Sequence, residues 1–392
     1  MMIDLGLLAF STAGIALYRE SLEVRGLLNA KKALFAGMLI GAAACTKYPA
    51  MLLLIVLVLH LWRLQLLHLS TPIWAGFALV LFPIQGLLWV QYDAFHPISA
   101  LSSITEIDRS SVTERGAGLL VRLGFGLSPF ALFGIRSLRK TWPIAALLGT
   151  LSVFILGRGD LGELGVLWLF FCSSAGVILL CRAAIALQSS KKPRMRLGDR
   201  EDAFLLGSWV WAVVLSIVVG HNHADSRYLL PAILPLALLV VRTASKESSS
   251  LRWTRLSTVI WGGVALLTAL ADHRLASASQ ALAQDIAEQK SPARFSGEWT
   301  VRHTLEAMEW TFWHPSEQLA PGDTVVLFSN GGAASPPPNS KIIERLVSPN
   351  HFPIRLLDWK ADAGYHSEQL GRLPFSWGHG PLIEATVYEV QE

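Results

Sequence analysis

The sequence has little charge. Asp, Glu, Lys and Arg make up only 16% of its 392 residues, whereas about a quarter of an average soluble protein is charged. Apolar residues make up 52%, and they gather in long runs before residue 273. This composition excludes a disordered chain and an ordinary cytosolic enzyme. We therefore predict a membrane protein with several spans.

Cysteine is also scarce. The three cysteines, Cys45, Cys172 and Cys181, all lie in apolar runs, where a free thiol behaves as a small hydrophobic side chain. The C-terminal segment contains none, so no disulfide framework supports it.

The pI of about 9.0 suggests nucleic-acid binding at first sight. The sequence has no basic tail that would support it. Residues 1–272 carry 24 Lys and Arg against 15 Asp and Glu, a net charge of +9. Residues 273–392 carry 9 against 14, a net charge of −5. The basic excess thus belongs to the apolar part, where loop charge sets the orientation of spans. We predict the lipid bilayer as a partner and no nucleic acid.

The apolar runs predict the spans. A spanning helix needs about 20 mostly apolar residues. Runs of this kind occupy 2–18, 33–46, 49–62, 73–91, 117–135, 143–157, 163–181, 203–220, 228–242 and 257–271. The sequence therefore predicts an all-α polytopic membrane domain of about ten transmembrane helices over residues 1–272.

Loop charge predicts which way these spans face. One alternating set of loops holds 18 basic residues and the other holds five. The positive-inside rule assigns the first set to the cytoplasm. Ten spans then place both termini on the outer side. Residues 1–18 include Asp4 and have no basic segment before the apolar run, which argues against a secretory signal peptide.

Residues 273–392 resemble an ordinary soluble sequence. We expect helices at 275–289 and 300–310, and strands at 324–329, 353–358 and 385–390, where β-branched and apolar residues gather. These elements predict a small C-terminal α/β domain on the extracytoplasmic side.

Polar residues near membrane depth are the candidates for function, because burying them is costly. Asp4 stands at the start of the first run, and Thr46-Lys47-Tyr48-Pro49 separates two runs. A lysine on the outer side needs a reason, and a phosphate would supply one. The competing interpretations are a water-exposed chain terminus for Asp4 and a snorkelling side chain for Lys47.

The densest polar segment precedes the run at 228–242. It contains His221, His223, Asp225, Arg227 and Tyr228. An arginine fork suits phosphate oxygens, so we interpret this segment as a phosphate contact; the alternative is a solvated interfacial loop. The spacing of the two histidines and the aspartate would also allow a metal, but a loop makes this signal weak, and no metal site is predicted.

The loop at 92–116 carries mixed charges. Glu106, Asp108 and Arg115 are among them. We expect these residues to form a solvated helix, and each of the charged side chains is a candidate for contact with a substrate.

Several segments resemble one family. These are GAAACTKYPAMLLL at 41–54, HADSRYLLPAILPLALL at 223–239, IDLGLLAFSTAGIALYR at 3–19, and FSGEW, PGD, AGYHS and LPF in the C-terminal segment. Together they resemble bacterial membrane glycosyltransferases of glycosyltransferase family 39, the dolichyl-phosphate-mannose protein mannosyltransferase type of the GT-C superfamily.

The resemblance implies an inverting transfer of a sugar from a polyprenyl-phosphate donor to an acceptor at the outer face of the bacterial inner membrane. Asp4 matches an acid near the active cavity and is the implied catalytic residue. Lys47 and Tyr48, together with Arg227 and Tyr228, match positions near the lipid phosphate. The donor is the only small-molecule partner implied, no cofactor is evident, and the acceptor is unknown.

The chain departs from this family at its start. Family members begin with a further span and a long outer loop that carries the catalytic base, and this sequence has no counterpart to either. Three interpretations follow: the start of the chain is misassigned, the chain is an N-terminally truncated and inactive fragment, or Asp4, Glu106 or Asp108 takes over as the base. The alternatives are a transporter or lipid flippase, and a non-catalytic membrane subunit.

Overall fold

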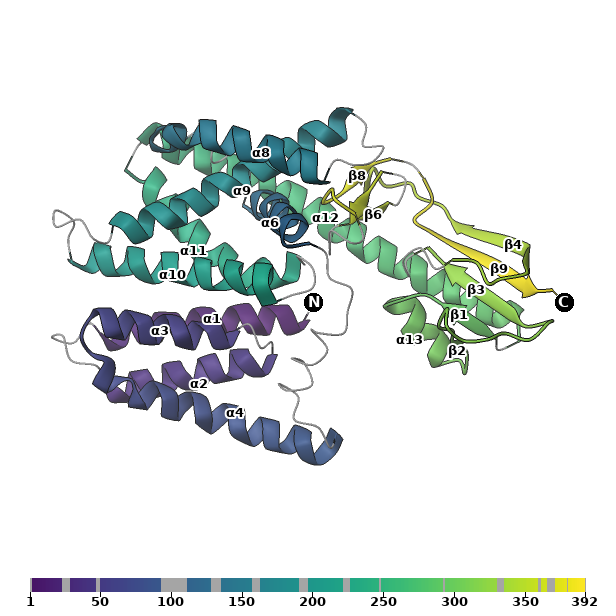
Figure 1. Cartoon of the computed structure of the whole chain (residues 1–392), viewed down its shortest axis with the longest axis horizontal. Coiled ribbons are helices and arrows are strands. Elements are labelled where there is room, and N and C mark those ends of the chain that lie inside the picture. Colours follow the sequence, from purple (N-terminus) through teal and green to yellow (C-terminus); the bar gives the residue numbers. More distant parts are fainter. Residues whose placement is uncertain are drawn as a thin grey trace. The chain divides into compact units, whose positions relative to one another are not determined.

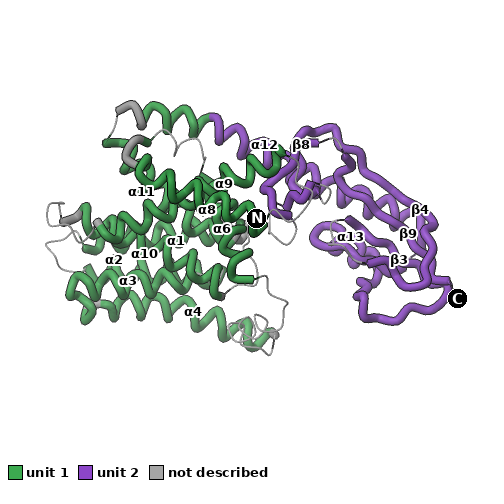
Figure 2. The backbone as a smooth tube through the Cα atoms, turned by 45° about the horizontal axis from the view of Figure 1, so that its top comes forward, with its two compact units in different colours: residues 1–259, 366–369 green, residues 260–365, 370–392 purple. Residues whose placement is uncertain are grey.

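The computed structural model describes most of the chain. The described residues are 2–22, 29–46, 50–92, 111–127, 135–156, 163–189, 197–220, 226–246, 248–291, 293–329, 335–358, 361–364, 371–378 and 380–391. They form two compact units, residues 1–259 with 366–369 and residues 260–365 with 370–392 (Figure 2). The predicted domain boundary after residue 272 lies inside helix α12 (Ser248–Gln289), which begins in the first unit and ends in the second.

The first unit consists of helices (Figure 1). They are α1 (Met2–Ser21), α2 (Ala30–Thr46), α3 (Met51–Arg63), α4 (Thr71–Tyr92), α6 (Val112–Gly126), α8 (Trp142–Leu156), α9 (Glu163–Ser189), α10 (Leu197–Gly220), α11 (Ser226–Ala244) and the start of α12, with short 3-10 turns η2 (Leu67–Leu69) and η3 (Arg136–Thr141). Each of the ten apolar runs overlaps one of these helices, although α6 ends at Gly126 and residues 128–134 of the run at 117–135 lie outside the described residues.

Four of the described helices are long and apolar enough to cross a membrane. These are α4, α9, α10 and α12, while α3 and α11 are shorter apolar helices. The prediction of a mainly helical protein with membrane-spanning helices is therefore confirmed in this coarse form. The count of about ten spans stays a prediction.

Glycines allow two pairs of helices to approach closely. A Cβ added to Gly124 of α6 would overlap the carbonyl of Cys172 in α9, and one added to Gly176 of α9 would overlap the carbonyl of Leu120. Gly37 of α2 meets the backbone of α4 in the same way. Small residues at crossings are typical of helices that pack within a membrane, where dispersion contacts replace the hydrophobic effect.

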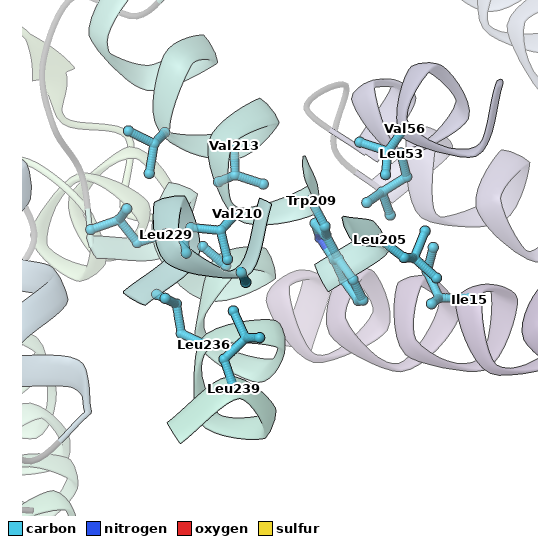
Figure 3. Packing of buried hydrophobic residues seen from close by; sticks show 14 of the residues in the cluster. Ile15, Leu53, Val56, Leu205, Trp209, Val210, Val213, Leu229, Leu236 and Leu239 are labelled. Carbon is cyan, nitrogen blue, oxygen red and sulfur yellow. The ribbon is translucent and has the colours of Figure 1, made fainter. Parts of the chain in front are cut away.

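Helix α10 supplies the centre of the first unit's core. Trp209 is 1% exposed, and the neighbouring apolar side chains of α10 are buried with it. Figure 3 shows these side chains beside those of three other helices, Ile15 of α1, Leu53 and Val56 of α3, and Leu229, Leu236 and Leu239 of α11. Helices that are distant in the sequence thus share one apolar core.

The second unit is built on a five-stranded sheet with strand order β2-β1-β3-β9-β4. Its strands are β1 (Arg294–Ser296), β2 (Thr311–Phe312), β3 (Thr324–Phe328), β4 (Ser340–Ser348) and β9 (Ile383–Val390). Strands β1, β2 and β3 are parallel, and β9 pairs antiparallel with both β3 and β4. The last turns of α12 and helix α13 (Thr300–Glu306) bury Ile286 and Leu305 in the same core as Phe295 and Val326.

The expected elements of this unit are partly right. The strands predicted at 324–329 and 385–390 are β3 and β9, while the one predicted at 353–358 is two short strands, β5 (Ile354–Arg355) and β6 (Leu357–Asp358). They pair with β8 (Ser376–Trp377) and β7 (Ala363–Gly364). Helix α13 ends at Glu306, and Glu309 then adopts a left-handed φ of 65°. The C-terminal combination of helix and strands is confirmed; its extracytoplasmic side stays a prediction.

Candidate functional site

Most of the residues singled out from sequence lie outside the described residues. These are Lys47, Tyr48, Glu106, Asp108, His221, His223 and Asp225. Asp4 and Arg227 belong to α1 and α11, for which only the backbone is described at these positions. Tyr228 is half-buried and packs against the core of the first unit.

The structure brings the start of α1 against the end of α2. Gly6 of α1 lies against Thr46, the last residue of α2, since a Cβ added to Gly6 would be 3.5 Å from the Thr46 methyl carbon. The Thr46 hydroxyl donates a 2.6 Å hydrogen bond to the carbonyl of Ala43. Asp4 precedes Gly6 by two residues, and Lys47 follows Thr46 directly. The start of α1, which includes Asp4, thus lies beside the last residue of α2, and Lys47 lies outside the described residues.

Ion pairs identify the opposite end of these helices. Arg19, near the end of α1, contacts Asp202 at 2.6 Å, and Arg63, at the end of α3, contacts Glu201 at 3.0 Å. Both acids lie in the first turns of α10.

Arg242, near the end of α11, completes this set by pairing with Asp199 at the start of α10. Since α1, α3 and α11 all finish at the beginning of α10, they all begin at the other end. Arg227 and Tyr228 in the first turn of α11 therefore share that end with Gly6 and Thr46.

Helix α6 carries two buried arginines. Arg115 and Arg122 are each 4% exposed. A capping box of Ser111 and Glu114 starts the helix, so α6 begins before Arg115 and includes it. The expectation that Arg115 belongs to a solvated helix is wrong, because it lies within the packed part of α6.

The two arginines lie on one face of α6. They are seven residues apart, which is two helical turns, and Gly126 follows Arg122 by four residues on the same face. Gly126 lies against Ile233, since an added Cβ would be 2.9 Å from its Cδ1 atom. Ile233 is in the second turn of α11. The face of α6 that carries the arginines therefore meets α11 at Gly126.

Arg122 is anchored partly by its own helix. Its Nη1 atom donates a 3.3 Å hydrogen bond to the carbonyl of Gly118. Sequence reasoning missed Arg122, although the signal was present: it is a single arginine inside the apolar segment GLLVRLGFG. Buried ionisable residues within membrane helices commonly mark substrate or ion sites.

A second polar cluster lies at the end where α10 begins. His60 of α3 is 1% exposed, and its Nδ1 atom is 2.8 Å from the hydroxyl of Tyr18 in α1. Its Nε2 atom is 3.5 Å from Glu201. Phe204 stacks on the imidazole, with ring centroids 6.1 Å apart, and the Arg63 guanidinium lies 4.5 Å from the Phe204 ring centroid. These close contacts join α1, α3 and α10, so the role of this cluster is structural.

Comparison with known proteins gives no assignment. No family model, curated protein or solved structure matches the chain. Over the described ranges, no three His, Cys, Asp or Glu residues come together as a potential metal site. The site is therefore defined by its own geometry: the buried arginine face of α6, beside α11, and the shared end of α1, α2 and α11.

Proposed function

We propose that the chain is a membrane glycosyltransferase that transfers a sugar from a polyprenyl-phosphate donor to an acceptor at the outer face of the membrane. The observation that carries this proposal is the pair of buried arginines, Arg115 and Arg122, on the face of α6 that meets α11. A guanidinium binds phosphate oxygens through two parallel hydrogen bonds. A buried arginine pair therefore suits a lipid phosphate that approaches from within the bilayer.

The position of the sequence motifs supports the same proposal. Asp4, Lys47 and Arg227 belong to the segments that resemble glycosyltransferase family 39. The backbone positions of Asp4 and Arg227 stand at the end of α1 and α11 opposite the ion pairs of α10, and Lys47 lies outside the described residues. The basic loops favour the α10 side as cytoplasmic. In this orientation the first turns of α1 and α11 lie outside, as a periplasmic transferase requires.

The proposed chemistry follows from the charges. An acceptor hydroxyl must lose a proton as it attacks the sugar, and a carboxylate such as Asp4 can accept it. The bond between the sugar and the phosphate breaks, and negative charge develops on the leaving phosphate. Fixed cations at Arg115, Arg122, Lys47 and Arg227 would stabilise that charge.

The donor site can be tested without knowing the acceptor. The full chain, reconstituted in lipid nanodiscs, is titrated with polyprenyl phosphate. Because hydrogen bonds between charged groups contribute roughly 1.5–3 kcal/mol, Arg122→Gln should weaken binding about tenfold or more. Arg139→Gln, which removes an exposed arginine outside α6, is the matched control and should bind normally.

Transfer itself needs a second measurement. Nanodiscs with polyprenyl-phosphate hexoses labelled in the sugar are assayed for release of free polyprenyl phosphate in the presence of membrane extract as the acceptor source. We expect Arg122→Gln to lower this release and Arg139→Gln to preserve it.

The binding titration can refute the arginine face as the donor site. It does so if both variants bind polyprenyl phosphate equally.

A transporter or lipid flippase is the second candidate. The observation that favours it is the set of ion pairs linking α1 and α3 to α10, because such contacts between distant helices can open and close one end of a pathway. The two functions differ in chemistry: a flippase moves polyprenyl-phosphate sugar between leaflets and leaves it intact. Leaflet exchange without cleavage in proteoliposomes, altered by Glu201→Gln, would favour this candidate.

A further inference from the structure

The second unit contains a cavity of about 620 Å³. It lies where the parallel strands β1, β2 and β3 begin, and β4 and β9 add Ile343 and Val387 to its wall. Its polar lining includes Lys290, Arg294, Glu309, Thr311, Asp323 and Thr324. A volume of this order is usual for a small-ligand site.

The lining of this cavity holds two cations, Lys290 and Arg294, and two carboxylates, Glu309 and Asp323, which differ in how they are paired. Lys290 pairs with Glu344 at 2.8 Å, and Arg294 pairs with Glu317 at 3.0 Å. Both of these carboxylates lie outside the lining, so the two lining cations are already neutralised.

The lining carboxylates are not neutralised in this way. In the described part of the chain, neither Glu309 nor Asp323 makes an ion pair. One Asp323 oxygen accepts a hydrogen bond of 2.9 Å from the backbone of Ala320, which leaves the other oxygen available. The cavity therefore presents two unneutralised negative charges beside the hydroxyls of Thr311 and Thr324.

Backbone conformation fixes the two acidic loops. Glu309 has a φ of 65°, and Gly322, next to Asp323, has a φ of 89°. The Gly322 amide donates to the carbonyl of Val390 at 2.9 Å, and the Val390 amide donates to the carbonyl of Asp323 at 3.0 Å. The Asp323 loop is thus held to β9, and its carboxylate is positioned before a ligand arrives.

We propose that this cavity binds a ligand through a cationic ammonium group, with Glu309 and Asp323 as its counter-ions and the threonine hydroxyls as additional partners. Either a free aliphatic amine or a lysine side chain of a peptide can supply this group. The site is separate from the proposed donor site and takes a ligand of opposite charge.

The test uses the full chain in nanodiscs and calorimetric titration. Cadaverine represents a free amine and the tripeptide Gly-Lys-Gly a lysine side chain. Their uncharged counterparts are 1,5-pentanediol and the tripeptide with an Nε-acetylated lysine. At least one charged probe should bind more tightly than its counterpart, and the tighter of the two identifies the source. Added salt should weaken that binding, because exposed charges are screened.

Variants decide whether the carboxylates are responsible. Each of Glu309→Gln and Asp323→Asn should weaken binding about fivefold, the range expected for partly exposed ion pairs. Glu306→Gln is the matched control, because it removes an exposed charge from the same segment and Glu306 pairs only with Arg302 among the described residues. Thermal unfolding shows whether each variant remains folded.

The proposal is overturned if neither charged probe binds better than its neutral counterpart. It is also overturned if a folded variant that combines Glu309→Gln with Asp323→Asn binds as the unmodified chain does, or if Glu306→Gln weakens binding equally. Binding of inorganic phosphate that is lost in Lys290→Gln and Arg294→Gln would assign the opposite ligand charge to the cavity.

Discussion

The hydroxyl of Tyr18 and Nδ1 of His60 lie 2.8 Å apart, although 42 residues separate them in the sequence. Both side chains are buried, at 0% and 1% exposure. Phe204 packs on one side of the imidazole, and Glu201 approaches its other nitrogen. This contact joins α1 to α3 at the position where α10 begins, and it makes the cluster a structural centre of the first unit.

Tyr18→Phe should destabilise the first unit. The substitution keeps the ring but removes the partner of the buried His60 Nδ1 atom, and an unsatisfied buried polar atom costs roughly 1–3 kcal/mol. Thermal unfolding of the purified chain in detergent measures the effect. Tyr388→Phe, which removes a hydroxyl in the second unit with no hydrogen bond among the described residues, should change little; equal losses in the two variants would contradict the assignment.

Glu201→Gln should cost more stability than Glu20→Gln. Glu201 pairs with Arg63, and both side chains are mostly buried, at 12% and 21% exposure. Removing the carboxylate takes away an ion-pair partner of the Arg63 guanidinium in the packed interior, with an expected loss of about 1–3 kcal/mol. Glu20 pairs with Lys32 in an exposed setting, where loss of the pair costs about 0–1 kcal/mol. Denaturant midpoints for the two variants provide the comparison.

Gly124→Ala and Gly262→Ala should have opposite effects. At Gly124 the added methyl would overlap the carbonyl of Cys172, so α6 and α9 must separate, and overpacking costs typically about 1–3 kcal/mol. At Gly262 in α12 an added Cβ meets nothing within 4 Å. Alanine there should stabilise the helix by up to about 1 kcal/mol. Melting temperatures that rise in both variants would show that the crossing is not close.

Lys47→Ala and Arg227→Ala should each reduce sugar transfer by the chain. The loss of a cation from a phosphate site removes charge-assisted hydrogen bonds, so a reduction of about tenfold or more is expected. Release of polyprenyl phosphate from labelled donor provides the measurement, and Lys140→Ala, at an exposed position in η3, serves as the control. Normal transfer by both variants would remove them from the proposed donor site.

The helices of the first unit could be predicted well from sequence because apolar runs of membrane-span length form helices almost without alternative. The sheet of the second unit was harder to predict. Strand β4 lies at the sheet edge and exposes Ile342, Ile343 and Val347, and its register shifts between Ile342 and Glu344. Its apolar residues therefore do not alternate between a buried and an exposed face, which is the pattern that identifies a strand.

The candidate site could be predicted only in part. Asp4, Lys47 and Arg227 attract attention because each adjoins an apolar run. Arg122 is marked in the sequence only as a single arginine within an apolar run, and its burial in α6 becomes apparent from the structure. Tyr18, His60 and Glu201 come from three distant segments, and only tertiary packing brings their side chains together.

The ion pairs of α10 also have a consequence for biogenesis. Arg63 and Glu201 are 138 residues apart in sequence. Ribosomes add roughly 5–20 residues per second, so Arg63 is synthesised about 7–28 s before its carboxylate partner. During that interval the end of α3 must keep its guanidinium hydrated or in contact with lipid headgroups. Final packing of the first helices therefore has to wait for α10, and a chain stalled before residue 201 should be a substrate for membrane quality control.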